Sequence, residues 1–226
     1  MSTASRTPSR KQPVPTAWVE PPGSGRLIEA NVQRVLTEIA ILSSERRTPT
    51  VAQAQQWHRE LYDGVWRPFD YYAGEVRDSD RRFPELIGYE VHVAGNPGAP
   101  SAIVPAELDR FELGAQRACA LLDAEIAPDT DPWMLTPRQL HGVLTLCAAL
   151  HGEWVRIHPF ANGNGRTARL WANWAALRFQ LPPFVTIKPR PGQPYAAAAL
   201  ASMRADHQMM TAVFDQMLRT SLGTLD

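Results

Sequence analysis

The 226 residues of the chain suffice for one large domain, or for one domain with tails. Apolar residues make up 44% of the sequence and charged residues 20%, which are ordinary proportions for a globular protein. The 23 lysines and arginines balance the 23 aspartates and glutamates, so the net charge gives no general attraction to nucleic acid or to membranes. Only two cysteines occur, which excludes a disulfide framework, and Cys119 and Cys147 lack the spacing of a metal cluster.

The first 25 residues differ in composition from the rest of the chain. They are rich in proline, serine and basic residues, so we expect residues 1–25 to form a disordered or loosely docked arm. The arm has no apolar core of signal-peptide length, and no stretch of the chain approaches the ~20 apolar residues of a membrane helix. We therefore expect a cytoplasmic protein that uses neither nucleic acid nor a membrane as a partner.

Helical patterns occupy most of the chain after this arm. Apolar residues recur at helical spacing from Ile28 to Leu42, and a second helical run extends from about Thr50 to Tyr62. Later helices are expected at 105–126, from 136–137 to about 155, from 164 or 165 to 179, at 193–204 and at 206–222.

Residues 66–104 interrupt the helices. The alternating run Tyr89-Glu90-Val91-His92-Val93 and a Gly-Asn-Pro-Gly turn at 95–98 predict irregular structure with a small β-hairpin. The predicted fold class is therefore mainly α, with one hairpin and no internal repeat.

Residues 157–169, with the sequence IHPFANGNGRTAR, combine a histidine, two glycines and two arginines between two expected helices. Glycines at 163 and 165 leave backbone N–H groups open to a bound group, and the start of a helix adds about half a positive charge. Arg166 and Arg169 lie three residues apart on that helix, so both reach the same region. The pattern favours an anion site, usually for phosphate, but an ordinary turn with solvated arginines explains the spacing about as well.

The segment from His158 to Arg169 closely resembles the Fic-domain motif HPFx(D/E)GNGRxxR, with one departure. His151 also resembles a histidine that commonly precedes this motif, and residues 73–77 and 89–93 resemble the region of the Fic flap. The resemblance runs from about Arg26 to the last helix and is strongest at 140–180. It implies a Fic domain over 26–226, a bundle of about seven or eight helices with a small hairpin flap.

This resemblance implies an enzyme that transfers a nucleoside monophosphate, most often AMP from ATP, to a serine, threonine or tyrosine hydroxyl of a protein and releases pyrophosphate. His158 is then the general base, because neutral imidazole accepts a proton near pH 7. The other implied roles are phosphate binding by Gly163, Asn164, Gly165, Arg166 and Arg169, target docking on the flap by Val91 and Val93, and nucleobase contact by Tyr195, for which simple packing is an equal reading. Phe160 is expected to anchor the loop in the core.

Asn162 is the departure: the family has an aspartate or glutamate there, which binds Mg²⁺. An amide oxygen attracts a hard cation less than a carboxylate does. Mg²⁺ is therefore an expected cofactor with weakened affinity, beside ATP as co-substrate. Altered nucleotide chemistry, or nucleotide binding without turnover, are the other readings of Asn162.

Many Fic proteins also carry a self-inhibitory helix, (S/T)xxxE(G/N), but no glutamate of this chain precedes glycine or asparagine. A separate small antitoxin, or no inhibitor at all, is therefore expected. Two further functions stay open: a phosphotransferase like the death-on-curing kinases, whose motif replaces the glycine-rich half, and an inactive nucleotide-binding interaction module.

Overall fold

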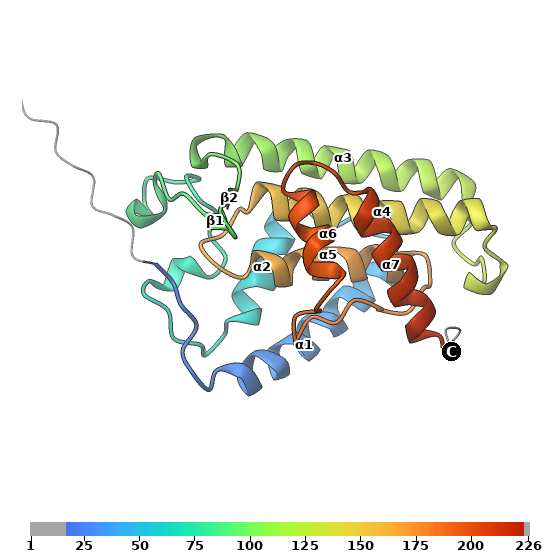
Figure 1. Cartoon of the computed structure of the whole chain (residues 1–226), viewed down its shortest axis with the longest axis horizontal. Coiled ribbons are helices and arrows are strands. Elements are labelled where there is room, and N and C mark those ends of the chain that lie inside the picture. The colour runs from blue at the N-terminus through green and yellow to red at the C-terminus, as the bar shows by residue number, and fades with distance from the viewer. Residues whose placement is uncertain (1–16, 224–226) are drawn as a thin grey trace, which may run out of the picture.

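The computed structural model describes residues 17–223, which fold into a mainly helical domain (Figure 1). Seven α-helices lie within this range, and the mainly α prediction is confirmed. Their bounds are α1 Gly25–Ser44, α2 Val51–Leu61, α3 Val104–Glu125, α4 Pro137–Ile157, α5 Asn164–Arg178, α6 Tyr195–Ser202 and α7 Gln208–Ser221.

Local signals in the sequence set several helix ends. The Thr50 hydroxyl accepts a hydrogen bond from the Gln53 N–H at the start of α2. At the start of α4, Thr136 and Gln139 form a capping box, and Pro137 occupies the first turn. These caps explain why the expected and observed helices differ by only a few residues.

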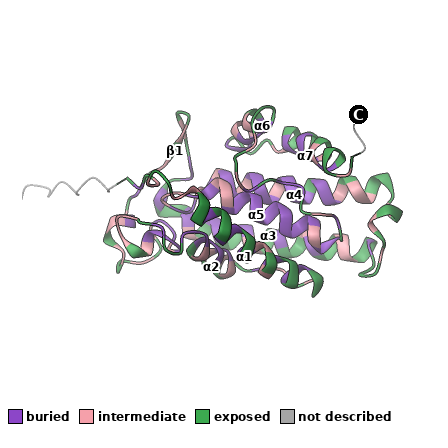
Figure 2. Cartoon of the chain, turned by 90° about the horizontal axis from the view of Figure 1, so that it is seen from below, coloured by how far each residue is buried: buried purple, intermediate pink, exposed green. Residues whose placement is uncertain are grey.

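Helix α5 forms the centre of the domain. Twelve of its 15 residues are buried, as expected for a helix enclosed on all sides. It packs against α4 and α1, and α4 in turn packs against α3 and α7 (Figures 1 and 2). Trp171 of α5 meets Trp57 of α2 and Trp154 of α4 at ring-centroid distances of 5.5 and 5.7 Å. The start of α5, where the motif lies, is therefore held from several sides.

The only hairpin in the described residues pairs β1 (His92–Val93) with β2 (Asn96–Pro97), and it extends away from the helices in Figure 2. Its turn is formed by Ala94 and Gly95, with φ values of 48° and 79°. Positive φ at both central residues is typical of a two-residue hairpin turn. The hairpin was predicted correctly, but the predicted turn at 95–98 is wrong, because Asn96 and Pro97 belong to the second strand.

The chain just before α1 packs on the domain. Trp18 is only 4% exposed, and its ring lies 4.5 Å from that of Tyr62. Residues 17–24, which were expected to belong to a loose arm, are thus attached through a buried aromatic side chain. The rest of the expected arm, residues 1–16, lies outside the described residues. No helix between residues 17 and 223 is long and apolar enough to cross a membrane.

Candidate functional site

A cavity of about 910 Å³ opens where the motif loop, the hairpin, α6 and residues 17–24 meet. It brings together residues that are far apart in the sequence. Every site residue predicted from the sequence lines it: Val91, Val93, His158, Asn162, Gly163, Asn164, Gly165, Arg166, Arg169 and Tyr195.

His158 follows the last residue of α4 and has a left-handed backbone, with φ 53° and ψ 57°. Its Nδ1 lies 2.7 Å from the Val155 carbonyl oxygen. A carbonyl only accepts, so Nδ1 carries the proton and Nε2 is left as an acceptor. Burial lowers the pKa of His158 to about 4. The imidazole is therefore neutral near pH 7, with one nitrogen ready to take a proton.

Arg77 holds the unusual backbone of this histidine, and sequence reasoning missed its role. Its fully buried guanidinium donates to the carbonyls of Ile157 and His158 at 3.0 and 2.8 Å. It also donates to the carbonyls of Tyr89 and Ala99, at 2.7 and 2.9 Å, on either side of the hairpin. A left-handed residue other than glycine persists where its surroundings fix it, and here Arg77 supplies much of that support.

Two polar side chains shape the motif loop from within. Asn164 accepts from the Phe160 N–H and donates to the Phe160 carbonyl, both at 2.8 Å. This side chain, expected on phosphate, instead closes the loop. Phe160 is fully buried, as predicted for an anchor, and stacks on His58 at 3.8 Å.

His58, which sequence reasoning also missed, supports the same loop. Its Nδ1 accepts from the Gly74 N–H at 2.9 Å, so its Nε2–H donates to the Asn162 carbonyl at 2.9 Å. Burial lowers the pKa of His58 to about 3, which keeps the ring neutral. His58 has no local motif that could have revealed its role, and the resemblance of residues 73–77 to the flap region gave Arg77 no role of its own.

Close contacts and a positive φ require glycine at position 163 of the motif. Gly163 has φ 80°, and a Cβ there would lie 2.6 Å from Tyr62 Oη and 2.7 Å from His58 Nε2. A Cβ on Gly165 would lie 3.4 Å from Arg169 Nη1, which is an ordinary van der Waals contact. The N–H groups of Asn164 and Gly165, at the first turn of α5, find no acceptor within residues 17–223. Such unpaired donors favour an anion.

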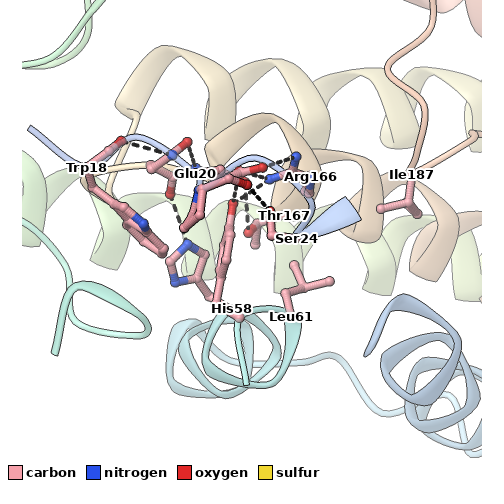
Figure 3. A network of polar contacts seen from close by, with 12 residues as sticks. Trp18, Glu20, Ser24, His58, Leu61, Arg166, Thr167 and Ile187 are labelled. Carbon is pink, nitrogen blue, oxygen red and sulfur yellow. Dashed lines mark hydrogen bonds and ion pairs between the residues drawn. The ribbon is translucent and has the colours of Figure 1, made fainter. Parts of the chain in front are cut away.

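Arg166 is paired with a carboxylate from the N-terminal segment (Figure 3). Its Nη2 donates to Glu20 Oε2 at 2.9 Å, and its Nη1 bonds Glu20 Oε1 and Tyr62 Oη. The Tyr62 hydroxyl also donates to Glu20 Oε1 at 3.0 Å. Burial raises the pKa of Glu20, but Arg166 and Tyr62 outweigh that effect and leave it below its ordinary value. Glu20 thus holds the guanidinium that was expected to bind phosphate.

Arg169 has no such partner among the described residues. It is 4% exposed and donates only to the Ile187 carbonyl, at 2.8 Å, and to Tyr195 Oη, at 3.2 Å. Its buried Nε has no hydrogen-bond partner in residues 17–223. Burial lowers the pKa of this guanidinium, yet arginine stays charged in proteins. A buried cation without a carboxylate at a cavity wall attracts an anion.

The Asn162 side chain is engaged with its own surroundings. Its Oδ1 accepts from the Gly163 N–H at 2.6 Å, and its Nδ2 donates to the Trp18 carbonyl at 3.1 Å. The amide oxygen is thus directed at the backbone, and no three acidic, histidine or cysteine side chains within residues 17–223 converge on a metal position. The residues present do not fit a Mg²⁺ ion held by the protein. Asn162 instead ties the motif loop to the N-terminal segment.

The remaining predicted residues occupy the cavity walls. Val91 and Val93 are partly exposed on the hairpin, and the Val91 carbonyl accepts from the Gly98 N–H at 3.0 Å. Tyr195 is 3% exposed at the start of α6, and its hydroxyl bonds His151 and Arg169. That hydroxyl is therefore occupied in the interior, whereas contact of the Tyr195 ring with a base stays a prediction.

Solved Fic structures share this fold. The structure of BepC with bound AMPPNP from Bartonella tribocorum matches with a TM-score of 0.55 and 16% identity, covering 84% of this chain and 86% of that one. Fic-1 from C. elegans matches with a TM-score of 0.57 and 20% identity, covering 87% of this chain and 48% of that one.

Sequence relatives match over shorter stretches. A uridine 5'-monophosphate transferase from Xanthomonas campestris pv. campestris (strain 8004) is 48% identical over 46 residues, which are 20% of this chain and 9% of that protein. A protein adenylyltransferase Fic from Nematostella vectensis is 44% identical over 55 residues, 24% of this chain and 13% of that protein. The chain thus matches only a small part of these relatives.

A family-level match covers more than half of the chain, from residue 48 to residue 176, and includes α2 to most of α5. Its description is the Fic/DOC family. With the helical fold and the complete glycine–arginine loop, this match shows that the chain belongs to the Fic/DOC family.

Proposed function

We propose that this protein transfers a nucleoside monophosphate, with AMP from ATP as the first candidate, to a hydroxyl group of a target protein. One observation carries the proposal. A neutral histidine with a free Nε2, two unpaired N–H groups and the buried Arg169 cation line one cavity. Relatives named as protein adenylyltransferase and uridine monophosphate transferase support nucleotide transfer and leave the nucleotide open.

In the proposed reaction, the target's hydroxyl oxygen attacks the α-phosphorus of the nucleotide. The new P–O bond forms as the bond to the β-phosphate oxygen breaks, and pyrophosphate leaves. The hydroxyl proton passes to Nε2 of His158, whose ring is oriented by the Val155 carbonyl. The N–H groups of Asn164 and Gly165 and the Arg169 guanidinium bind the phosphates and the charge that develops on the leaving group.

Two features set the starting conditions of this reaction. Glu20 must leave Arg166 before a phosphate can bind that guanidinium, because both anions need the same donors. No step is assigned to a metal ion, since the Asn162 amide oxygen faces the Gly163 N–H. The hairpin edge near Val91 and Val93 is the proposed docking edge for the target backbone.

Transfer of label from ATP tests the proposal. The chain is incubated with a cell lysate as the source of targets and with ATP labelled at the α- or the γ-phosphate. Protein-bound label from the α-phosphate only, and an added mass of one nucleoside monophosphate, is the expected result. Label from the γ-phosphate would instead indicate a phosphotransferase, and nucleotide binding without label would indicate an interaction module. Parallel reactions with GTP, CTP and UTP identify the preferred nucleotide.

The histidine variant must preserve the left-handed backbone. Asparagine tolerates positive φ better than most residues, so His158→Asn removes the base with little strain at φ 53°. This variant is expected to lose transfer and retain nucleotide binding. His141→Asn, at an exposed position of α4, is the matched control. Transfer by His158→Asn at the control's rate would contradict the base role.

A separate small inhibitor protein stays part of the proposal. Tandem purification of the tagged chain is expected to recover a small partner that suppresses labelling. Full activity of the chain in its native host, with no such partner recovered, would rule this part out.

A further inference from the structure

The hydroxyl of Tyr195 lies between a motif arginine and a buried histidine. Arg169 Nη1 is 3.2 Å from Tyr195 Oη, and His151 Nε2 is 2.7 Å from the same oxygen. His151 is fully buried in α4, and Tyr195 is the first residue of α6. Three separate helices therefore contribute one polar chain behind the cavity.

The direction of each hydrogen bond follows from the groups involved. A guanidinium can only donate, so Tyr195 Oη accepts from Arg169 and keeps its own proton available. His151 can accept that proton at Nε2 because its ring is neutral: burial lowers its pKa to about 3. The chain thus runs from Arg169 through Tyr195 to His151, with each donor facing an acceptor.

This polar chain does little for the stability of the fold. His151 Nδ1 and Arg169 Nε are buried without a hydrogen-bond partner in the described residues. Each unsatisfied buried polar group carries a penalty, and a buried guanidinium without a carboxylate carries a larger one. Apolar side chains in the same space would give a more stable core, so the arrangement is better explained by what it does for Arg169.

The first arginine of the motif, Arg166, is paired with a tyrosine in the same way. Arg166 donates to Tyr62 Oη at 2.5 Å, and its guanidinium lies 5.7 Å from the Tyr62 ring centre. The Arg169 guanidinium lies 5.9 Å from the ring of Tyr195. The acceptors behind the two tyrosines differ: Tyr62 donates to Glu20, whereas Tyr195 faces the buried His151. Only Arg169 is therefore fixed by neutral groups that leave its charge for an incoming anion.

We propose that Tyr195, with His151 as its hydrogen-bond acceptor, is a positioning residue that fixes the Arg169 guanidinium for the leaving phosphates. The proposal rests on the proposed nucleotidyl transfer for its kinetic consequence. Its structural part concerns the free protein alone. One N–H of Nη1 and one of Nη2 are held by Tyr195 and the Ile187 carbonyl, and the second N–H of each nitrogen remains for the ligand. Such preorganised donors stabilise developing charge without reorganisation.

Tyr195→Phe tests this role because it removes the hydroxyl and keeps the ring. Tyr71→Phe is the matched control, since the Tyr71 hydroxyl bonds Glu85 outside the cavity. The first readout is the Arg169 Nε–H resonance of the nitrogen-15-labelled free protein, assigned by its loss in Arg169→Lys. Tyr195→Phe is expected to shift this resonance, because the guanidinium loses the hydrogen bond from Nη1 to Tyr195 Oη that fixes its orientation. The control is expected to leave it unchanged.

The second readout is kinetic. Tyr195→Phe is expected to lower kcat about tenfold or more, while KM for the nucleotide changes less than threefold, because the lost orientation matters most as charge develops. A merely structural role lowers the Tm and leaves kcat of the folded fraction unchanged. If Tyr195→Phe folds poorly, His151→Gln and His151→Leu replace it: glutamine keeps an acceptor and is expected to retain kcat, whereas leucine is expected to lose it.

The two readouts separate this proposal from the proposed function. An unchanged Nε–H resonance overturns the positioning role, whether or not the protein transfers nucleotide. A changed resonance with wild-type kcat also overturns it. If the wild type transfers no label, the proposed function fails, and the Arg169 Nε–H resonance of the free protein alone decides the positioning role.

Discussion

Replacing Glu20 by glutamine removes the negative charge that holds Arg166 and keeps the size of the side chain. The carboxylate makes two contacts with the guanidinium and accepts from the Tyr62 hydroxyl. An anion that binds Arg166 must first displace it, so the free energy of this pairing subtracts directly from the free energy of anion binding. We therefore expect Glu20→Gln to bind ATP more tightly than the wild type.

The size of the effect follows from the burial of the pair. The Arg166 and Glu20 side chains are 18% and 22% exposed. A fully exposed ion pair contributes at most about 1 kcal/mol, and a hydrogen bond to a buried charge about 1.5–3 kcal/mol. A partly exposed pair lies between these limits, at about 1.4 kcal/mol, which corresponds to about a tenfold gain in affinity.

Isothermal titration with ATP and with tripolyphosphate measures this gain. Glu29→Gln, on the exposed face of α1, is the control and is expected to bind like the wild type. The gain should appear with both ligands, because it belongs to the phosphates and not to the base. Equal affinity of Glu20→Gln and wild type, within twofold, would refute the reasoning and show that Arg166 does not hold the phosphates.

Three further outcomes are expected. Asn162→Asp cannot donate to the Trp18 carbonyl, so proteolysis near residue 20 should become faster. Its carboxylate should also strengthen Mn²⁺ binding, measured by electron paramagnetic resonance. Gly163→Ala should destabilise the fold by about 2 kcal/mol or more in urea unfolding, because of its positive φ and the contacts of its Cβ. The matched Gly114→Ala, where a Cβ meets nothing within 4 Å, should stabilise by up to about 1 kcal/mol. Stability should also fall as the pH drops from about 6.5 towards 4, because His58 and His151 have folded pKa values of about 3.

The sign of the pH effect follows from proton binding. Below pH 6.5 the unfolded chain takes up protons that the buried neutral histidines refuse, so each histidine costs up to about 1.4 kcal/mol per pH unit in that window. A flat unfolding free energy between pH 6.5 and 4.5 would contradict these pKa shifts.

For Asn162→Asp, unchanged proteolysis and Mn²⁺ binding would show that the amide does not hold the N-terminal segment. For the glycines, equal effects of the two alanine variants would exclude the steric argument.

The elements with local signals were predictable from the sequence. The helices followed from apolar spacing and from caps such as Thr50 and Thr136, whose partners lie three residues away. The contiguous motif likewise placed His158 and Arg169 in one site. The turn of the hairpin was misplaced because the sequence Gly-Asn-Pro-Gly offered a stronger turn signal than Ala94-Gly95.

The partners of the site residues were not predictable, because they come from distant parts of the chain. Glu20 lies 146 residues before Arg166, and Arg77 lies 81 residues before His158. No composition or spacing reveals such pairs. The contacts of the Asn164 side chain were not predictable for a related reason: an amide in a phosphate motif can face a ligand or its own backbone, and only the fold decides between them.

If a target docks on the hairpin as proposed, Arg77 has a consequence for how that target is selected. One guanidinium joins the carbonyls on both sides of the hairpin to those of Ile157 and His158. The span from the base of the hairpin to the imidazole is therefore held by the four hydrogen bonds of one buried guanidinium. A target backbone laid along the hairpin then presents only the hydroxyl that matches this span. A target chosen in this way can have many different sequences around the modified residue. What matters is the position of the hydroxyl oxygen along the docked target backbone.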